Sequence, residues 1–190
     1  MACPEWFVTM HNPPQPSLDR LTPFAGNAIV VGVVPNQPDL VVATAISFAQ
    51  ATGSNGIYFA YADSSRYVHE ELLDGSVRHV ALNPDSLDQD WQERSAAIEA
   101  RLEQSMDGTN IPWQFRYLAG RPDRALTHLA RAVNAAVIVV GSRADGRTQA
   151  IREFFEGSVA VHLAQHQHRP VLTVPLSVVD WKDTASKWEK

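Results

Sequence analysis

The run Ala28-Ile-Val-Val-Gly-Val-Val34 decides the fold. It contains no polar side chain, and its bulky residues are all β-branched. A strand with one face in water alternates apolar and polar residues, so this run predicts a strand buried on both faces, as in a parallel sheet. Pro35-Asn-Gln-Pro38 ends the strand, and the apolar spacing over 40–52 predicts a helix with Asp39 as its cap.

The alternation of apolar strand and helix continues along the chain. Residues 63–84 are expected to be largely irregular, with a short strand at 77–82. Right-handed crossovers give an α/β protein with an open, mainly parallel five-stranded sheet and helices on both faces. Ligands of such sheets bind beyond the carboxyl ends of the strands, near the switch point. The further predicted strands are 57–62, 113–118, 136–140 and 170–174, and the further helices are 86–106, one starting near Asp123, and 157–167.

The composition is that of a globular protein. Of 190 residues, 45% are hydrophobic and 19% charged, which is enough apolar material for the core of one domain. We expect an α/β domain at 26–176, between a proline-rich arm at 1–25 and a polar tail at 177–190. The arm is interpreted as an ordered segment over an apolar patch, with a partner-binding or oligomer-locking arm as the alternative. Trp181 and Trp188 in the tail indicate docking onto this protomer or its mate.

Charge and cysteine content exclude several classes. The net charge of −5 argues against a nucleic-acid partner, which normally needs a basic face. The lone Cys3 excludes an internal disulfide and a cysteine-based zinc site. No apolar stretch approaches the roughly 20 residues of a membrane span. Residues 1–16 have no secretory signal, so we expect a cytoplasmic protein with no membrane partner.

Signatures of common enzymes are missing from the sequence. It has no P-loop, no dinucleotide-binding glycine turn after the first strand, and no nucleophile elbow. His162 and His166 have the i, i+4 spacing of a zinc pair, but no third ligand is evident. The simpler interpretation is that a protonated histidine near the C-terminal end of this helix interacts favourably with the helix dipole. We expect no catalytic residues and no metal site, and slow ATP hydrolysis stays open.

The segment 141–158 carries the clearest signal for a ligand. It begins Gly141-Ser-Arg-Ala-Asp-Gly146 and ends at Gly157-Ser158, where a helix is expected to start. Glycine permits a close approach of the backbone, and a helix N-terminus offers unpaired N–H groups to an anion. The alternative is that this segment binds no ligand. In that case Gly141 forms a turn, Gly157-Ser158 caps a helix, and the arginines pair with neighbouring acids. The arginines that would bind phosphate are Arg143, Arg147 and Arg152.

A nucleotide bound to this segment would place its base at the ends of the first two strands. The residues expected beside the base are Val33, Val34 and Tyr61. Tyr61 is equally interpretable as a core aromatic residue. Asp63 could meet a ribose hydroxyl, but a role as a turn residue is the simpler interpretation.

Three stretches occur together and in order: Val139-Val-Gly-Ser-Arg143, Gly157-Ser-Val-Ala160 and His168-Arg-Pro-Val-Leu-Thr-Val-Pro175. Taken together they resemble the C-terminal signature of universal stress proteins. Ala119-Gly-Arg-Pro-Asp-Arg-Ala125 is similar to the segment before the fourth strand of that family. The resemblance covers roughly residues 27–176.

The resemblance implies a fold and a pattern for binding ATP. The fold is a five-stranded, adenine nucleotide alpha hydrolase-like α/β domain. One branch of the family binds ATP through glycine, two residues, glycine, nine residues, then glycine with Ser or Thr. Gly141 matches the first position, and Gly157 and Ser158 match the last two. Ala144 replaces the second glycine, Gly146 can substitute for it, and Val34 stands where the family commonly has Asp.

We therefore expect a stress-response or regulatory protein that binds ATP, with Mg²⁺, or AMP. The alternative is a dimeric interaction or scaffold protein of the same fold with no nucleotide, which the altered loop favours. The family usually forms a homodimer through the last strand, here Val171, Leu172, Thr173 and Val174. The expected nucleotide-binding set is Val33, Val34, Tyr61, Gly141, Ser142, Arg143, Gly146, Arg147, Gly157, Ser158 and Val159.

Overall fold

A parallel sheet forms the centre of the protein. The computed structural model describes residues 17–82, 90–142 and 159–176. The strands of the sheet lie in the order β5-β2-β1-β6-β7, and every neighbouring pair is parallel, as predicted. The five strands are β1 (Ile29–Gly32), β2 (Ile57–Asp63), β5 (Trp113–Ala119), β6 (Val137–Gly141) and β7 (Val171–Val174).

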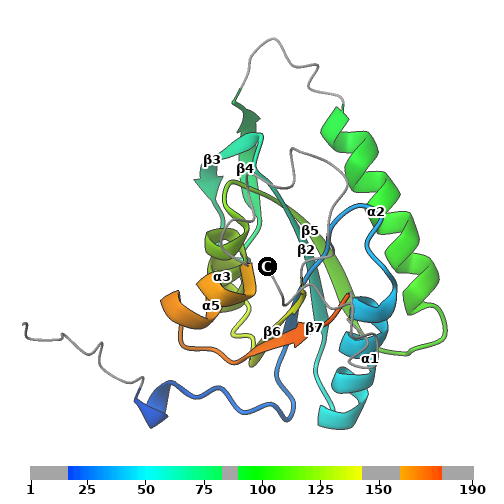
Figure 1. Cartoon of the computed structure of the whole chain (residues 1–190), viewed down its shortest axis with the longest axis vertical. Coiled ribbons are helices and arrows are strands. Elements are labelled where there is room, and N and C mark those ends of the chain that lie inside the picture. The colour runs from blue at the N-terminus through cyan, green and yellow to red at the C-terminus, as the bar shows by residue number, and fades with distance from the viewer. Residues whose placement is uncertain (1–16, 83–89, 143–158, 177–190) are drawn as a thin grey trace, which may run out of the picture.

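Helices cover both faces of the sheet (Figure 1). On one face α1 (Leu40–Thr52) and α2 (Asp90–Met106) share a core with the sheet, and on the other α3 (Pro122–Ala132) and α5 (Val159–His166) do so. This is what right-handed crossovers require, since the chain passes from β1 toward β5 and then returns across the sheet to β6 and β7.

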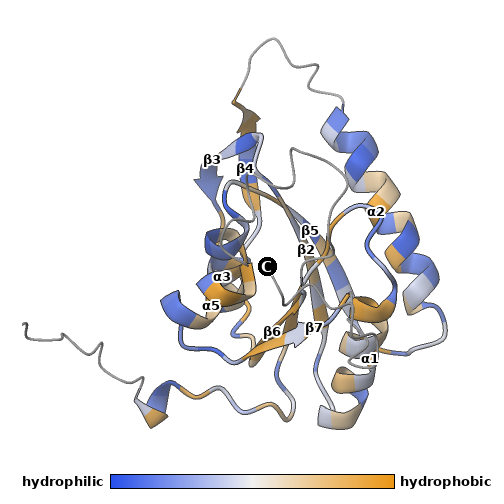
Figure 2. Cartoon of the chain, in the orientation of Figure 1, coloured by the Kyte–Doolittle hydropathy of each residue, from blue (hydrophilic) through white to orange (hydrophobic). Residues whose placement is uncertain are grey.

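Strand β1 contributes to both cores. Val31 is fully buried among residues of α1 and α2, and its neighbour Val30 is fully buried among residues of α3 and α5. Successive side chains of a strand point to opposite faces, so a strand covered on both sides needs apolar residues at every position. Figure 2 shows hydrophobic colour on β6 and a mixture of hydrophobic and polar colour on α2 and α5.

The segment after β2 is more regular than predicted. The strand expected at 77–82 is confirmed as β4 (Val77–Ala81), but it pairs with a second strand, β3 (Arg66–Glu71), in an antiparallel hairpin. The expectation of a largely irregular segment is therefore wrong. Strand β3 reads Arg-Tyr-Val-His-Glu-Glu and is mostly exposed, so no apolar pattern marks it. Its pairing rests on backbone hydrogen bonds that composition does not report.

Two element boundaries also differ from the sequence analysis. Asp39 lies at the start of α1, but its side chain makes no capping hydrogen bond. It accepts two hydrogen bonds from Arg101 of α2 instead, at 3.1 and 2.6 Å. The described part of α2 begins at Asp90, and the start predicted at residue 86 lies outside the described residues.

The described end of the arm lies against the domain. A short 3-10 helix, η1 (Leu18–Arg20), is followed by Phe24, whose ring meets that of Phe48 on α1 edge-on at 5.7 Å. Within the described end of the arm this contact is made by Phe24, whereas η1 has no buried residue and Leu18 is 90% exposed. Residues 1–16 and the tail with both its tryptophans lie outside the described residues. None of the described helices is long and apolar enough to cross a membrane.

We predict that the tip of the hairpin tolerates no side chain at Gly75. Its φ is +79°, and a Cβ there would lie 2.7 Å from Leu129 Cδ1 and 3.0 Å from Ala132 Cβ of α3. Gly75→Ala should lower the free energy of unfolding by about 2–4 kcal/mol in urea titrations, because backbone strain and a clash add. Gly108→Ala is the matched control, with φ +70° and open space, and should lose about 1 kcal/mol. Equal losses of unfolding free energy in the two variants would show that the hairpin tip is not in tight contact with α3.

Candidate functional site

The candidate site is the crevice between the carboxyl ends of β1 and β6. The connections leave these two neighbouring strands toward opposite faces of the sheet, which is the switch point of an open α/β sheet. The loop after β1 closes on itself here. Val34 N donates to Gln37 Oε1 at 2.9 Å, and Gln37 N donates to Val34 O at 3.3 Å. The side chain of Gln37 is thereby held over the crevice.

The space beside Gly141 is occupied by the protein's own side chains. A Cβ on Gly141 would lie 2.7 Å from Leu176 Cδ1 and 2.9 Å from Gln37 Nε2. Gln37 is only 9% exposed, which is low for an amide side chain in a loop. In this structure the absence of a side chain at Gly141 lets Leu176 and Gln37 approach its backbone. The sequence analysis expected a ligand to make this approach.

Ser142 has structural partners on both its backbone and its side chain. Its N–H donates to Val174 O at 2.6 Å, and its hydroxyl accepts a hydrogen bond from Leu176 N at 3.0 Å. These contacts hold the chain after β7 against the end of β6. The backbone N–H of Ser142 is thereby used within the protein, while the hydroxyl keeps its own O–H as a donor.

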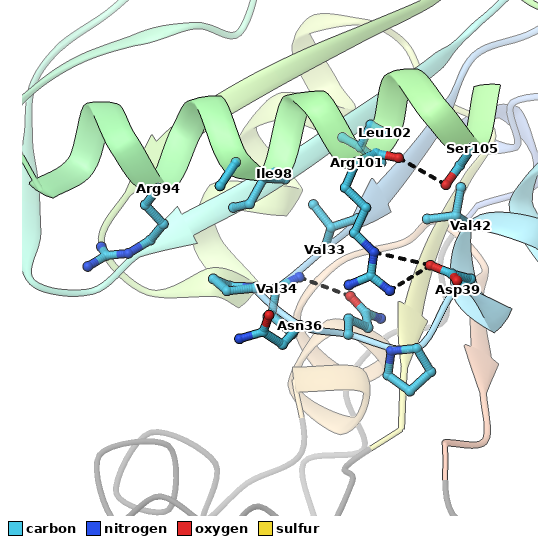
Figure 3. Close-up of a pocket in the computed structure, with 14 residues that line it drawn as sticks. Val33, Val34, Asn36, Asp39, Val42, Arg94, Ile98, Arg101, Leu102 and Ser105 are labelled. Carbon is cyan, nitrogen blue, oxygen red and sulfur yellow. Dashed lines mark hydrogen bonds and ion pairs between the residues drawn. The ribbon is translucent and has the colours of Figure 1, made fainter. Parts of the chain in front are cut away.

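An open groove lies beside the crevice, between the β1 loop and α2 (Figure 3). Val33 and Val34 line it, as do Arg94 and Arg101. Figure 3 shows Arg101 turned toward Asp39 at one end of the groove and Arg94 directed away from it at the other. The groove has a volume of about 110 Å³. That is below the 300–1,000 Å³ of a typical small-molecule pocket, so it can hold part of a ligand.

The structure thus brings together only part of the predicted set. Val33 and Val34 line the groove, and Gly141 and Ser142 lie at the crevice with protein partners. Tyr61 is absent from the groove lining and belongs to a separate cluster of side chains on β2, β5 and α2, to which Arg94 of the groove also belongs. Val159 is the first described residue of α5. The predicted residues outside the described parts of the chain are Arg143, Gly146, Arg147, Gly157 and Ser158.

That separate cluster is built around the buried carboxylate of Asp63, at the end of β2. Asp63 is 4% exposed and accepts four hydrogen bonds. Ser65 supplies two to one oxygen, from its N–H at 2.9 Å and its hydroxyl at 2.6 Å. Tyr117 and Arg94 supply the others to the second oxygen, at 2.6 and 2.7 Å. The turn interpretation of Asp63 fits this geometry, because its acceptor sites are directed at the protein.

The electrostatics of this cluster keep Asp63 charged. Burial acts to raise the pKa of Asp63, but the hydrogen bonds from Ser65 and Tyr117 and the charge of Arg94 outweigh it, so the pKa lies below its usual value. Burial, together with the hydrogen bond to Asp63, raises the pKa of Tyr117. Burial and the charge of Asp63 raise the pKa of Tyr61 as well. Tyr117 therefore stays a protonated donor, and its bond to the carboxylate persists across the neutral range.

Sequence reasoning missed the residues that close the crevice. In the sequence, Gln37 has no feature that distinguishes it from other loop residues, and Leu176 lies just past the last predicted strand. No spacing connects either of them to Gly141. The Asp63-Ser64-Ser65 sequence did carry a usable signal, because an Asp side chain often accepts from the backbone two residues on. Arg94 and Tyr117 could not be paired with Asp63 without the three-dimensional fold.

The strand order, the covering helices and the crevice define an adenine nucleotide alpha hydrolase-like α/β protein. The model of the universal stress protein family matches residues 27–175. The chain therefore belongs to the universal stress protein family. A sequence search of curated proteins finds no match.

Solved structures of the family share this fold at low sequence identity. A universal stress protein in complex with cAMP is 23% identical, has a TM-score of 0.55, and covers 80% of this chain and 99% of its own. The universal stress protein from Archaeoglobus fulgidus in complex with dAMP is 19% identical, with a TM-score of 0.52 and coverage of 78% and 97%. UspA from Lactobacillus plantarum is 16% identical, with a TM-score of 0.57 and coverage of 79% and 98%.

We predict that Asp63→Asn lowers the free energy of unfolding by about 3 kcal/mol at pH 7, because a buried, multiply bonded carboxylate is lost beside Arg94. The pKa of Asp63 is lowered by folding, so its stabilisation is complete above the unfolded value of 3.8 and fades as the pH falls through the folded value. Urea titrations at neutral pH and below about pH 4 should show the difference from wild type shrinking in acid.

The control for this prediction is Asp39→Asn. Asp39 also pairs with an arginine of α2, but its side chain is 74% exposed. Its loss should cost less than about 1 kcal/mol. A penalty for Asp63→Asn that is equally small, or that does not change with pH, would show that the buried carboxylate is not the electrostatic centre of the cluster.

Proposed function

We propose that this universal stress protein is a regulatory protein that binds an adenine nucleotide, AMP or ATP, at the crevice between β1 and β6. The observation that carries the proposal is the groove beside Val33 and Val34, which opens to solvent at the switch point. Relatives of the same fold are described in complex with cAMP and dAMP. The base would enter the groove, and the phosphates would extend toward loop 141–158.

The chemistry of the described residues suits one part of such a ligand. Val33 and Val34 offer apolar contact to a purine ring, and Val34 is 45% exposed and so accessible. Gly141 and Ser142 do not offer an open phosphate site while Leu176 and Gln37 occupy the crevice. Binding therefore requires Gln37 to release Val34 N and swing away. The ligand's contacts must offset the loss of that hydrogen bond, worth about 1 kcal/mol.

A second candidate is an interaction protein with no nucleotide. The closed space beside Gly141 favours it, because a crevice already filled by Leu176 and Gln37 needs no ligand for stability. Its working surface would be the free edge of the sheet at β7. Among the described strands, β7 pairs only with β6, and Leu172 and Thr173 retain exposed surface. An apolar strand edge of this kind suits pairing with a second copy.

For the nucleotide, we predict saturable binding of AMP or ATP in equilibrium dialysis, and tighter binding by Val34→Asp. A carboxylate at the end of β1 would accept hydrogen bonds from the ribose hydroxyls, which should raise affinity about tenfold. Val34→Asn is the matched control, because it has nearly the same shape without the charge and should gain less. Ser158→Trp should block binding by filling the phosphate position predicted from the sequence.

Gln37→Ala tests the closure itself. Removing the amide should open the space beside Gly141 and raise affinity several-fold, roughly 1 kcal/mol, because its hydrogen bond no longer has to be broken. Gln50→Ala, on the exposed side of α1, is the control and should leave affinity unchanged. If wild type, Val34→Asp and Gln37→Ala all fail to bind at millimolar nucleotide, the nucleotide proposal is wrong.

For the second candidate, we predict a homodimer at micromolar concentration in light scattering without added nucleotide. Thr173→Lys should shift the protein toward the monomer, because a charge on the exposed edge opposes strand pairing. Ser47→Lys, on an exposed position of α1, is the control and should leave the mass unchanged. A wild-type monomer at this concentration would contradict the dimer.

A further inference from the structure

A second polar centre lies at the opposite end of the strands from Gly141. Arg169 sits in the turn between α5 and β7 and is only 8% exposed. Its Nε donates to Ala135 O at 2.7 Å. The side chain of Gln167 fixes the backbone of Arg169 on both sides, donating to its carbonyl and accepting from its N–H, each at 2.6 Å. The guanidinium is therefore held in place by the fold.

The hydrogen bonding of Arg169 is incomplete. Its Nη1 is buried and has no hydrogen-bond partner. A buried polar group without a partner is rare in native proteins, and a buried charged group without one costs several kcal/mol. Arg169 thus has donor capacity that the described parts of the chain do not use.

Other cations converge on the same place. Arg131 lies in the last turn of α3, and its carbonyl accepts from Asn134 N at 3.2 Å, next to the Ala135 that holds Arg169. Thr22, two residues after Arg20, contacts Asn134 Oδ1 through its Oγ1 at 3.4 Å, and the charge of Arg20 acts on His168, the neighbour of Arg169 in sequence. Figure 1 shows η1 below the connection from α5 to β7. Three separate segments therefore present cations at this end of the sheet.

No acid neutralises them within the described residues 17–82, 90–142 and 159–176. No carboxylate there forms an ion pair with Arg20, Arg131 or Arg169. Asp19 compensates part of the charge of Arg20, which helps to lower the pKa of Asp19, but it forms no ion pair with Arg131 or Arg169. Burial and then the charge of Arg131 lower the pKa of Arg169. Burial and the charges of these three arginines likewise lower the pKa of His168.

The end of α3 explains only part of this arrangement. A helix C-terminus favours nearby cations by about 0.3–1 kcal/mol, and this accounts for Arg131 and for the bond of Arg169 to Ala135 O. It does not account for the unpaired Nη1, nor for Arg20 on a separate segment. An anion between the three arginines would satisfy the buried donor and offset the repulsion among the cations.

We propose that the site formed by Arg169, Arg131 and Arg20 binds a doubly charged phosphate group, either as inorganic phosphate or as the monoester of a small molecule. The exposed side chains of Arg131 and Arg20 would hold the phosphate from α3 and η1, and a local shift of the covering chain would let it reach the buried Nη1 of Arg169. The site is independent of the nucleotide proposal, because it lies at the amino end of the sheet and shares no residue with the crevice.

The test is a titration of the ¹⁵N-labelled full chain with inorganic phosphate at constant ionic strength, followed by NMR. We expect saturable shifts of the Arg169 Nε–H and of the amides at 134–136. The double variant Arg20→Gln, Arg131→Gln should weaken binding at least tenfold while keeping its fold, since both side chains are exposed. Arg78→Gln is the control, because Arg78 is 70% exposed and pairs with Glu70 on the hairpin.

Arg169→Gln should abolish phosphate binding. If that variant does not fold, the double variant carries the test. The same titration with glycerol phosphate distinguishes inorganic phosphate from a phosphate monoester as the ligand. A site for a monoester should bind glycerol phosphate as tightly as inorganic phosphate. Acetate at equal ionic strength should bind at least tenfold more weakly, because it carries one charge. Shifts that do not saturate, or that are the same in the double variant, would overturn the proposal, as would acetate binding equal to that of phosphate.

Discussion

The burial of β1 on both faces is the constraint on which the rest of the structure depends. Val30 and Val31 belong to two different cores, and each core is completed by helices that only long crossovers can deliver. Once β1 is central, the crossover rule assigns α1 and α2 to one face and α3 and α5 to the other. The crevice at its carboxyl end follows from the same geometry, because the chain leaves β1 and β6 in opposite directions. The candidate site is thus a consequence of the topology before any side chain is considered.

The side chains then decide whether that crevice is open. A glycine at the end of a strand lets another group approach the backbone, and that group can be a ligand or the protein itself. At Gly141 it is the protein, since Leu176 and Gln37 occupy the position of a Cβ. The same Gln37 satisfies the N–H of Val34, at the position where the family commonly has an acidic residue. One amide therefore contacts the crevice at both Val34 and Gly141. Its movement would free Val34 N and part of the space beside Gly141, where Leu176 remains.

Patterns that depend on neighbours in the sequence could be predicted, and contacts between distant segments could not. Four strands of the sheet were predictable as short apolar runs, and β5 was predictable from the alternation typical of a strand near an edge. Gly53 after α1 has the left-handed φ of +59° that a helix end favours. Strand β3 was missed because its residues are polar and its partner lies across a turn. Asp39 was expected to cap α1, but Arg101, 62 residues away, competes successfully for its carboxylate. The closure of Gly141 by Leu176 is of the same long-range kind.

The buried charged groups at the two ends of the sheet, Asp63 and Arg169, differ in how completely they are hydrogen-bonded. At the carboxyl end, Asp63 is enclosed by donors from Ser65, Tyr117 and Arg94, so its charge is fully compensated and stabilises the fold. At the amino end, Arg169 is buried to a similar degree but has one hydrogen bond to a carbonyl and a donor without a partner. Desolvation disfavours both groups alike, so the difference lies in what surrounds them. Arg116 also has a buried donor without a partner, so the unpaired Nη1 alone does not indicate a ligand. The presence of Arg131, whose charge acts on Arg169, distinguishes the amino end of the sheet and favours an anion from outside the described chain.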